Sequence, residues 1–305
     1  MLRPEFSDGP EPVLLDGGLA TQLEAQGADL RTPLWSAQVL LADPAAVVAA
    51  HQAFFAAGAR VATTASYQAP VELIGLSVRL AQRAREAHLS SELSAWSVAR
   101  ATTHADKSEG ELWVAGSVGP YGAALADGSE YRGDYGLSVA ELRAWHRPRI
   151  AALVEAGVDV LALETIPTAV EVEALLAEVA GTGVPCWLSI TAQGEQTRAG
   201  EPASAAFALA RDVPEVLAVG VNCVDPEDVP GLLALAAEAS GKPGVAYPNR
   251  GEGWDADAKT WTGPGAFAPA DVTGWVAGGA RLVGGCCRVT PADIAAMRTA
   301  LSTAR

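Results

Sequence analysis

The 305-residue sequence predicts an α/β protein of the (β/α)₈, or TIM, barrel class, organised as a single domain over residues 1–305. Short apolar runs and helical patterns alternate eight times along the chain, as βα units do. Most of the runs are apolar throughout, which is typical of parallel strands buried on both faces. Eight such units in about 300 residues match the size of this barrel. The competing doubly wound sheet usually has a Gly-rich phosphate fingerprint after its first strand, and Asp16–Leu19 does not match it.

The expected elements follow from apolar runs, cap residues and breakers. Asp43-Pro44 begins a helix, Ser138 and Glu141 have capping-box spacing, and Thr290 caps the last helix with Asp293 in its first turn. The stretch 19–33 is expected to be irregular or briefly helical, and 248–264 to be a long loop. Strands are expected at 13–16, 60–65, 112–118, 158–164, 186–191, 216–222, 244–247 and 280–283. Helices are expected at 43–58, 70–101 (with a break), 138–157, 168–180, 203–211, 226–239, 269–277 and 291–301.

Composition limits the partners and the compartment. The chain has 21 Lys and Arg against 36 Asp and Glu, a net charge of −15, and this acidic surface repels phosphate backbones, so nucleic acid is not an expected partner. No apolar run approaches the roughly 20 residues that span a bilayer, so no membrane association is expected. The first ten residues lack the apolar segment of a secretory signal, which predicts a cytoplasmic protein. No candidate interface is evident, and a monomer is expected.

The cysteines carry the chemistry of this sequence. Cys286 and Cys287 follow the eighth strand and Cys223 follows the sixth, whereas Cys186 lies at the opposite end of the fifth and is interpreted as structural. Adjacent cysteines are poorly placed for a disulfide but can put two thiolates on one metal ion. The alternative is that they are small buried apolar residues. Active sites of these barrels lie at the carboxyl ends of the strands, so Cys223, Cys286 and Cys287 predict a zinc site with an open fourth position, the catalytic type.

The ligand type predicts the reaction type. Three thiolates on Zn²⁺ leave a net charge of −1, which suits a soft sulfur ligand better than the activation of water. A substrate thiol bound there would be deprotonated. The total charge would then be −2, which favours an incoming cation. The sequence therefore indicates a thiol nucleophile that attacks a positively charged alkyl donor. The four histidines, His51, His88, His104 and His146, lie in helical or inter-helix segments away from this face and are not expected to be ligands.

Two carboxylates at strand ends indicate an amino-acid substrate. Asp16 ends the first strand and Glu164 the fourth, and together they would accept a substrate ammonium group. The backbone N–H groups of Gly17, Gly18 and Leu19 could bind a carboxylate, since glycine permits close approach. The alternative interpretation is that Asp16 and Glu164 are ordinary strand-end carboxylates that cap neighbouring loops.

The motifs resemble those of the zinc-dependent homocysteine S-methyltransferases, in particular the branch that uses S-methylmethionine. The most specific are Gly220-Val-Asn-Cys223 and Gly284-Gly-Cys-Cys-Arg288. Further matches run over nearly the whole chain: Leu15–Glu24, Leu34–Leu40, Thr63–Gln68, Gly116–Gly122, Glu164–Pro167, Tyr247–Asn249 and Lys259–Trp261.

This resemblance implies a site and a reaction. It implies that Cys223, Cys286 and Cys287 bind zinc, that Asp16 and Glu164 contact the amino group of homocysteine, and that the Gly17–Leu19 amides lie near its carboxylate. It also implies that Tyr67 and Trp35 line the donor pocket and that Asn222 supports the site by hydrogen bonding. Core packing is the alternative role for the two aromatic residues. Methyl transfer from S-methylmethionine to homocysteine is the expected activity. S-adenosylmethionine as donor, selenocysteine or another thiol as acceptor, and a non-catalytic zinc- or thiol-binding regulator remain open alternatives.

Overall fold

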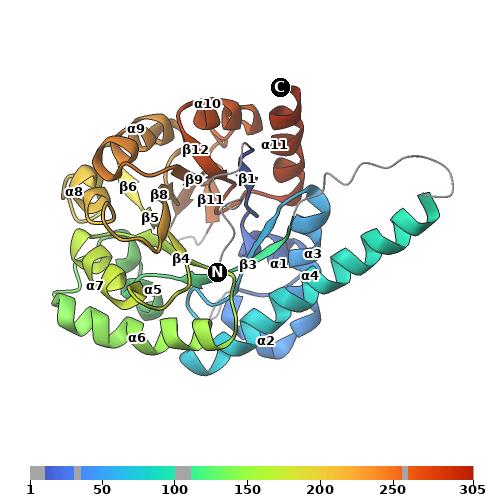
Figure 1. The fold of residues 1–305 in the computed structure, drawn as a ribbon, viewed down its shortest axis with the longest axis horizontal. Coiled ribbons are helices and arrows are strands. Elements are labelled where there is room, and N and C mark those ends of the chain that lie inside the picture. The colour runs from blue at the N-terminus through green and yellow to red at the C-terminus, as the bar shows by residue number, and fades with distance from the viewer. Residues whose placement is uncertain (1–10, 31–35, 100–110, 256–259, 305) are drawn as a thin grey trace.

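A sheet of eight parallel strands forms the centre of the protein, and helices surround it (Figure 1). The computed structural model describes residues 11–30, 36–99, 111–255 and 260–304. The order of the strands is β1-β12-β9-β8-β5-β4-β3-β2. The Arg60 N–H donates to the Leu14 carbonyl oxygen at 2.7 Å and links the two edges, so the barrel is nearly closed. The strands are β1 (Val13–Leu14), β2 (Val61–Thr63), β3 (Trp113–Val118), β4 (Val160–Ile166), β5 (Cys186–Ile190), β8 (Val216–Asn222), β9 (Gly244–Tyr247) and β12 (Ala280–Val283). The predicted barrel and its eight strands are confirmed.

The helices begin where the cap residues predict. The Asp43 carboxylate accepts from the Ala46 N–H at the start of α3, and Ser138 and Thr290 form complete capping boxes with Glu141 and Asp293. The α-helices are α1 (Leu19–Ala25), α2 (Ser36–Ala42), α3 (Pro44–Ala57), α4 (Val71–Ala99), α5 (Tyr121–Leu125), α6 (Val139–Glu155), α7 (Ala169–Val179), α8 (Ala203–Ala208), α9 (Val229–Ser240), α10 (Val272–Ala277) and α11 (Pro291–Thr303). Single 3₁₀ turns are η2 (Ser129–Tyr131), η3 (Pro226–Asp228) and η4 (Pro269–Asp271).

One helix differs from its prediction. The break expected within 70–101 is wrong, because α4 runs without interruption from Val71 to Ala99. This segment contains no proline and a single glycine, Gly75, so nothing in it removes a backbone donor. In Figure 1 the helix extends well beyond the ring of the barrel.

Short elements within the loops have no counterpart in the predicted elements. Two hairpins, β6 (Ala192–Gln193) with β7 (Gln196–Thr197) and β10 (Gly253–Asp255) with β11 (Thr260–Thr262), follow β5 and β9. Strands of two or three residues are too short to show an alternating pattern. Both hairpins lie on the carboxyl-terminal side of the barrel, where they add to the loops around its mouth.

The interior of the barrel is filled with side chains. Val13, Leu15, Trp113, Trp187 and Leu282 belong to one buried cluster inside the ring of strands. A larger cluster packs the outer faces of the strands against the helices. The filled interior closes the lower part of the barrel, so the polar groups at the carboxyl ends of the strands are the ones left to form a site. In the described part of the chain, no helix combines the length and apolarity needed to cross a bilayer.

Candidate functional site

Three sulfur atoms meet at the mouth of the barrel. The Sγ atoms of Cys223, Cys286 and Cys287 all lie within 4.8 Å of one another, and those of Cys223 and Cys286 are 2.6 Å apart. Cys223 directly follows β8, and the other two follow β12 after two glycines. Cys186 is fully buried at the start of β5, at the opposite end of the barrel. The structure thus brings together the three cysteines predicted to bind metal and separates the fourth.

The glycines before Cys286 act by close packing. A Cβ on Gly284 would lie 2.7 Å from the Leu15 Cβ, and one on Gly285 would overlap the Val289 side chain. Neither glycine has a positive φ; the left-handed residues of this region are Cys223 (φ 51°) and Arg288 (φ 69°). The two glycines let the ligand turn lie directly against the end of β1 and against Val289.

The loop after β9 holds the peptide of Cys287 from both sides. The Asn249 side-chain oxygen accepts from the Cys287 N–H at 3.1 Å, and the Arg250 N–H donates to the Cys287 carbonyl at 3.0 Å. The Cys286 N–H donates to the Pro248 carbonyl at 2.8 Å. These bonds fix the backbone of both adjacent cysteines, so their sulfurs are preorganised.

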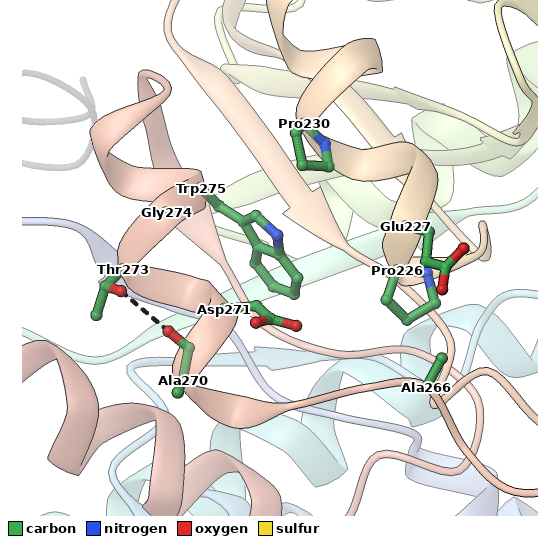
Figure 2. Close-up of a pocket in the computed structure, with 9 residues that line it drawn as sticks. All are labelled: Pro226, Glu227, Pro230, Ala266, Ala270, Asp271, Thr273, Gly274 and Trp275. Carbon is green, nitrogen blue, oxygen red and sulfur yellow. Dashed lines mark hydrogen bonds between the residues drawn. The ribbon is translucent and has the colours of Figure 1, made fainter.

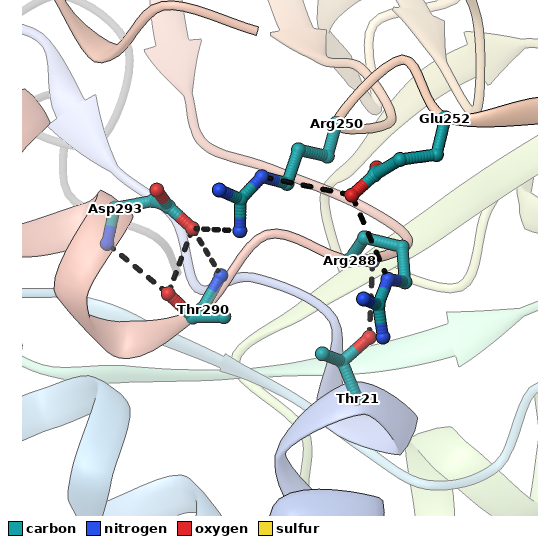
Figure 3. Close-up of polar contacts among 6 residues, drawn as sticks. All are labelled: Thr21, Arg250, Glu252, Arg288, Thr290 and Asp293. Carbon is teal, nitrogen blue, oxygen red and sulfur yellow. Dashed lines mark hydrogen bonds and ion pairs between the residues drawn. The ribbon is translucent and has the colours of Figure 1, made fainter. Parts of the chain in front are cut away.

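A chain of alternating charges braces the same turn from outside (Figure 3). The Glu252 carboxylate lies 3.8 Å from the Arg288 Nε and 3.7 Å from the Arg250 Nε. Arg250 in turn lies 3.8 Å from the carboxylate of Asp293, which completes the cap of α11 with Thr290. This connection ties the predicted Thr290 cap of α11 to the loop that holds the cysteines.

The thiol protons are shared unequally. Hydrogen bonds to Cys286 and Cys287 raise the pKa of the Cys223 thiol, because its proton is held in the cluster. The pKa of Cys287 lies well below its usual range, because its sulfur accepts from the thiols of Cys223 and Cys286. The lowered pKa favours the thiolate form at Cys287.

The donor set fits zinc. Zn–S bonds are about 2.3 Å long, and soft thiolate ligands favour this ion. Three sulfurs within 4.8 Å can surround one such ion and leave a fourth position open. The described histidines do not contribute: His51, His88 and His146 lie on α3, α4 and α6, on the outer layer of the barrel. His104 lies outside the described residues.

Asp16 lies beside the sulfurs at the seam where the barrel closes. Its carboxylate accepts from the Thr63 N–H at 2.7 Å and from the Thr63 hydroxyl at 2.8 Å. Burial raises its pKa from 3.8 to about 7. Its partner Thr63 comes from the far edge of the sheet, so only the closed barrel places the two together.

Glu164 is the second buried carboxylate. It accepts from the Ser117 and Tyr247 hydroxyls, the latter at 3.2 Å, and burial raises its pKa from 4.5 to about 8. The nearby charges of Cys286 and Asp16 raise it further. Within the described residues neither Asp16 nor Glu164 forms an ion pair. Two buried carboxylates without a cation are costly unless a ligand supplies one.

The predicted carboxylate-binding amides at 17–19 are partly used by the protein. The Gly18 N–H donates to the Val289 carbonyl at 3.0 Å. A Cβ on Gly17 or Gly18 would lie 2.6 Å from the Val289 oxygen or 2.7 Å from the Cys286 oxygen. Both glycines therefore serve close packing against the ligand turn, and the Gly18 amide is already bonded within the protein.

Asn222 connects the sulfurs with the strand that carries Glu164. Its Oδ1 accepts from the Thr165 N–H at 2.7 Å and from the Ser189 hydroxyl at 2.8 Å. Its Nδ2 donates to the Thr165 Oγ1 at 2.8 Å and lies 3.9 Å from the Cys286 sulfur. The amide is therefore fully used inside the protein, in agreement with a supporting role.

Two tyrosines lie close enough to the cluster for the charge of Cys223 to raise the pKa of their hydroxyl groups. Burial, followed by the proximity of Cys223, raises the pKa of the Tyr67 hydroxyl. For Tyr131, a residue absent from the predicted site, the charge of Cys223 is the largest cause of a raised pKa. The Arg198 Nε donates to the Tyr131 carbonyl at 3.1 Å and holds this loop. Trp35, predicted beside the donor, lies outside the described residues.

The sequence could have indicated some of the residues missed. Tyr247 and Asn249 stand at the end of a predicted strand, although only the fold shows their partners. Thr63 and Ser117 stand in the matched segments Thr63–Gln68 and Gly116–Gly122 but have no predicted role, and Tyr131 stands in none of the matched segments.

The described chain also has a cavity of about 480 Å³ away from the cysteines (Figure 2). It lies between the starts of α9 and α10 on the outer side of the barrel. Pro226, Pro230 and Trp275 line it, together with the carboxylates of Glu227 and Asp271. None of the residues that line it belongs to the sulfur cluster, so it is separate from the candidate site.

The fold and the site define a class of protein. A (β/α)₈ barrel with three cysteine sulfurs at its mouth, beside two buried carboxylates, has the features of a metal-dependent enzyme that acts on a thiol. The family model "Homocysteine S-methyltransferase" matches residues 13–301. The chain belongs to the homocysteine S-methyltransferase family, whose members are methyltransferases.

Individual relatives agree over nearly the full length. The chain is 45% identical to the homocysteine S-methyltransferase of Escherichia coli, over 95% of this chain and 96% of that protein. It is 40% identical to homocysteine S-methyltransferase YbgG of Bacillus subtilis, over 92% of each. The crystal structure of the E. coli homocysteine methyltransferase MmuM in its metallated form superposes with a TM-score of 0.82 at 41% identity, over 96% of this chain and 97% of that one.

Proposed function

We propose that this protein transfers a methyl group from S-methylmethionine to homocysteine, and that zinc held by Cys223, Cys286 and Cys287 is its cofactor. Family membership supports homocysteine as the acceptor. The observation that carries the proposal is the meeting of three sulfurs and two buried carboxylates at one barrel mouth, where no described residue forms an ion pair with either carboxylate. A substrate with one thiol and one ammonium group satisfies both.

Each part of the chain has a distinct task in this reaction. Asp16 and Glu164 accept the ammonium group of homocysteine and lose their protons to do so. The amides of Gly17 and Leu19 lie beside its carboxylate. When bound, zinc supplies the positive charge that keeps the sulfur of homocysteine as a thiolate at neutral pH. Asn222, Asn249 and Thr63 hold the cysteines and carboxylates in place.

The chemical step is a displacement at carbon. The thiolate of homocysteine attacks a methyl carbon of the sulfonium, one S–C bond forms and another breaks, and the electron pair of the broken bond stays on the leaving sulfur. Both products are methionine. The leaving group is a neutral thioether, so no proton needs to be moved at the methyl group. Alignment of the two sulfur atoms is the main contribution of the protein. Tyr67 and Tyr131 offer aromatic and hydroxyl groups beside the place where the cation arrives.

The setting of this activity belongs to the same proposal. We infer a monomer of residues 1–305 that acts in the cytoplasm on small molecules, without nucleic acid or membrane as partners. The acidic composition and four unpaired cysteines support this setting.

The decisive assay uses homocysteine with a ¹³C-labelled carbon chain and unlabelled S-methylmethionine. Labelled methionine must form, with zinc measured on the same sample by atomic emission. S-adenosylmethionine replaces the donor in a parallel reaction, and selenocysteine replaces the acceptor in another. Stoichiometric zinc without labelled methionine from either donor would instead identify a zinc- or thiol-binding regulator.

A further inference from the structure

Trp187 is a fully buried tryptophan of β5 in the interior of the barrel. It belongs to the cluster that fills this interior, but its indole N–H still needs an acceptor, because a buried donor without one is costly. The acceptor is the hydroxyl oxygen of Tyr247, 2.9 Å away. The two rings meet edge to face, with their centroids 6.3 Å apart and an angle of 87° between their planes. A residue of the barrel interior is thus bonded directly to a residue of the mouth.

Tyr247 continues this contact to Glu164. Its hydroxyl group donates to the Glu164 Oε2 at 3.2 Å. In the sheet β8 and β5 lie between β9, which carries Tyr247, and β4, which carries Glu164, so this bond crosses the interior of the barrel. An indole N–H can only donate, and an ionised carboxylate can only accept. The Tyr247 oxygen therefore accepts from Trp187, and the single hydroxyl proton of Tyr247 lies in the bond to Glu164 when this carboxylate is ionised.

The other oxygen of Glu164 has a donor of its own. The Ser117 hydroxyl donates to Oε1, and the Ser117 N–H donates to the Thr64 hydroxyl oxygen at 3.0 Å. Each carboxylate oxygen therefore has one hydroxyl donor, and each can accept a further bond from an ammonium group. Burial raises the pKa of Glu164 to about 8, and the bonds from Ser117 and Tyr247 act in the opposite direction. The two hydroxyl groups thus favour the charged form that binds a cation.

The two donors are held in different ways. Ser117 lies in β3, the direct neighbour of β4, so regular strand pairing brings it to Glu164. Tyr247 reaches Glu164 with the far end of a long side chain, and the Trp187 N–H bonds that end. Hydrogen bonds in a chain polarise one another, so donation from Trp187 also makes the Tyr247 hydroxyl a stronger donor.

We propose that Trp187 is a positioning residue for homocysteine: through Tyr247 it holds the Glu164 carboxylate ready for the ammonium group of the substrate. This inference rests on the proposed function, in which Glu164 contacts that ammonium group. The chain of side-chain hydrogen bonds leads from Trp187 to Glu164 and not to the cysteines. Binding of zinc and of the substrate thiol should therefore not depend on Trp187.

Two ligands distinguish this role from packing. Homocysteine carries a thiol and an ammonium group, whereas 4-mercaptobutanoate has the same carbon chain, thiol and carboxylate without the ammonium group. Calorimetric titration measures the Kd of each for the zinc-loaded protein. Trp187→Phe should raise the Kd of homocysteine about three- to tenfold, as the loss of one hydrogen bond does. The Kd of 4-mercaptobutanoate should stay within about twofold of wild type, and the zinc content and the KM for S-methylmethionine should not change.

Tyr247→Phe completes a double-mutant cycle. It removes a hydrogen bond to a charged group and should raise the Kd of homocysteine roughly 10- to 100-fold. In this variant Trp187→Phe should cost less than about a further twofold, because the bond that Trp187 supports is already absent. Trp275→Phe is the matched control: Trp275 is also buried but lies on α10, outside the barrel interior, so its variant should bind both ligands as wild type does.

A second substitution covers the case in which Trp187→Phe does not fold. β-(3-Benzothienyl)alanine at position 187 keeps the bicyclic ring and replaces only the N–H group by sulfur, and it should give the same selective loss. Equal losses for the two ligands, or equal losses with and without the Tyr247 hydroxyl, would overturn this inference, because Trp187 would then act by packing. A wild-type protein that binds both ligands equally would overturn the ammonium contact and this inference together. Absence of methyl transfer in the wild type would overturn the proposed function itself.

Discussion

The sulfur atoms of Cys223 and Cys286 lie 2.6 Å apart, although 63 residues separate them in the sequence. Their meeting depends on the neighbouring positions of β8, β9 and β12 in the barrel. Removing one of these three cysteines should have a consequence that can be measured directly, the loss of the bound metal.

Cys286→Ala should abolish both stoichiometric zinc and methyl transfer, because two thiolates cannot hold the ion as three do. Zinc content and activity are measured on the same purified sample. Cys186→Ala is the matched control: this cysteine is equally a free thiol but is buried at the opposite end of the barrel, so its variant should keep zinc and activity. Zinc retained at full stoichiometry in Cys286→Ala would contradict the assignment.

Stability of the reduced, metal-free protein should fall as the pH rises from about 4 to about 8. The folded pKa values of Asp16 and Glu164 are raised to about 7 and about 8, so in this window the folded state holds protons that the unfolded state has released. The two carboxyl groups stabilise the folded state fully at a pH below their pKa values in the unfolded chain. This stabilisation is lost as the pH rises through their pKa values in the folded protein. Each group contributes a slope of up to about 1.4 kcal/mol per pH unit. Urea unfolding at several pH values measures the free energy of unfolding. In the double variant Asp16→Asn, Glu164→Gln this free energy should depend less on pH.

The same carboxylates should govern the affinity for homocysteine. Glu164→Gln removes the charge but keeps a side chain that can hydrogen-bond Ser117 and Tyr247, so the loss reports the ammonium contact. A hydrogen bond to a charged group contributes about 1.5–3 kcal/mol, so the KM for homocysteine should rise roughly 10- to 100-fold. The KM for the methyl donor should change far less. Equal increases in the KM values of both substrates would show that Glu164 does not contact the ammonium group of homocysteine specifically.

The loop after β3 should depend on a buried carboxylate that lies outside the site and accepts two hydrogen bonds. Glu171 Oε1 accepts from the Tyr121 N–H at 2.6 Å and lies 2.9 Å from the His146 Nε2, with both side chains fully buried. Glu171→Ala leaves these two buried groups without their acceptor and should destabilise the protein by about 1–3 kcal/mol for each. Glu171→Gln retains an acceptor oxygen and should cost clearly less. The Tm values of the two variants are compared by calorimetry. Equal losses would show that the packing of the Glu171 side chain, and not its hydrogen bonding, stabilises this region.

Much of this site could be predicted because it depends on strand order alone. Asp16, Glu164 and the three cysteines stand at the ends of recognisable apolar runs, and a parallel barrel brings such ends together. The contacts that tune the site depend on register and closure instead. Thr63 reaches Asp16 only across the closing seam, and Thr165 faces inward only because of a bulge. Gly284 and Gly285 stand in a recognised motif, but their close packing against Leu15 and Val289 can be seen only in the fold.

Gly220 offers a test of how closely the barrel is packed beneath the site. A Cβ at this position in β8 would overlap the Val245 carbonyl oxygen of β9, which is backbone and cannot rotate away. Gly220→Ala should therefore push apart the strands that lead to Cys223 and Tyr247, with a loss of about 1–3 kcal/mol in stability. Gly231→Ala is the control, because this glycine lies in α9 with no neighbour near its added Cβ. Its substitution should raise stability by about 0.5–1 kcal/mol.

Since Gly220 lies two residues before Asn222, its alanine variant should also lower kcat/KM, whereas Gly231→Ala should leave the rate unchanged. A Gly220→Ala protein as stable and active as wild type would show that β8 and β9 can separate without disturbing the sulfurs.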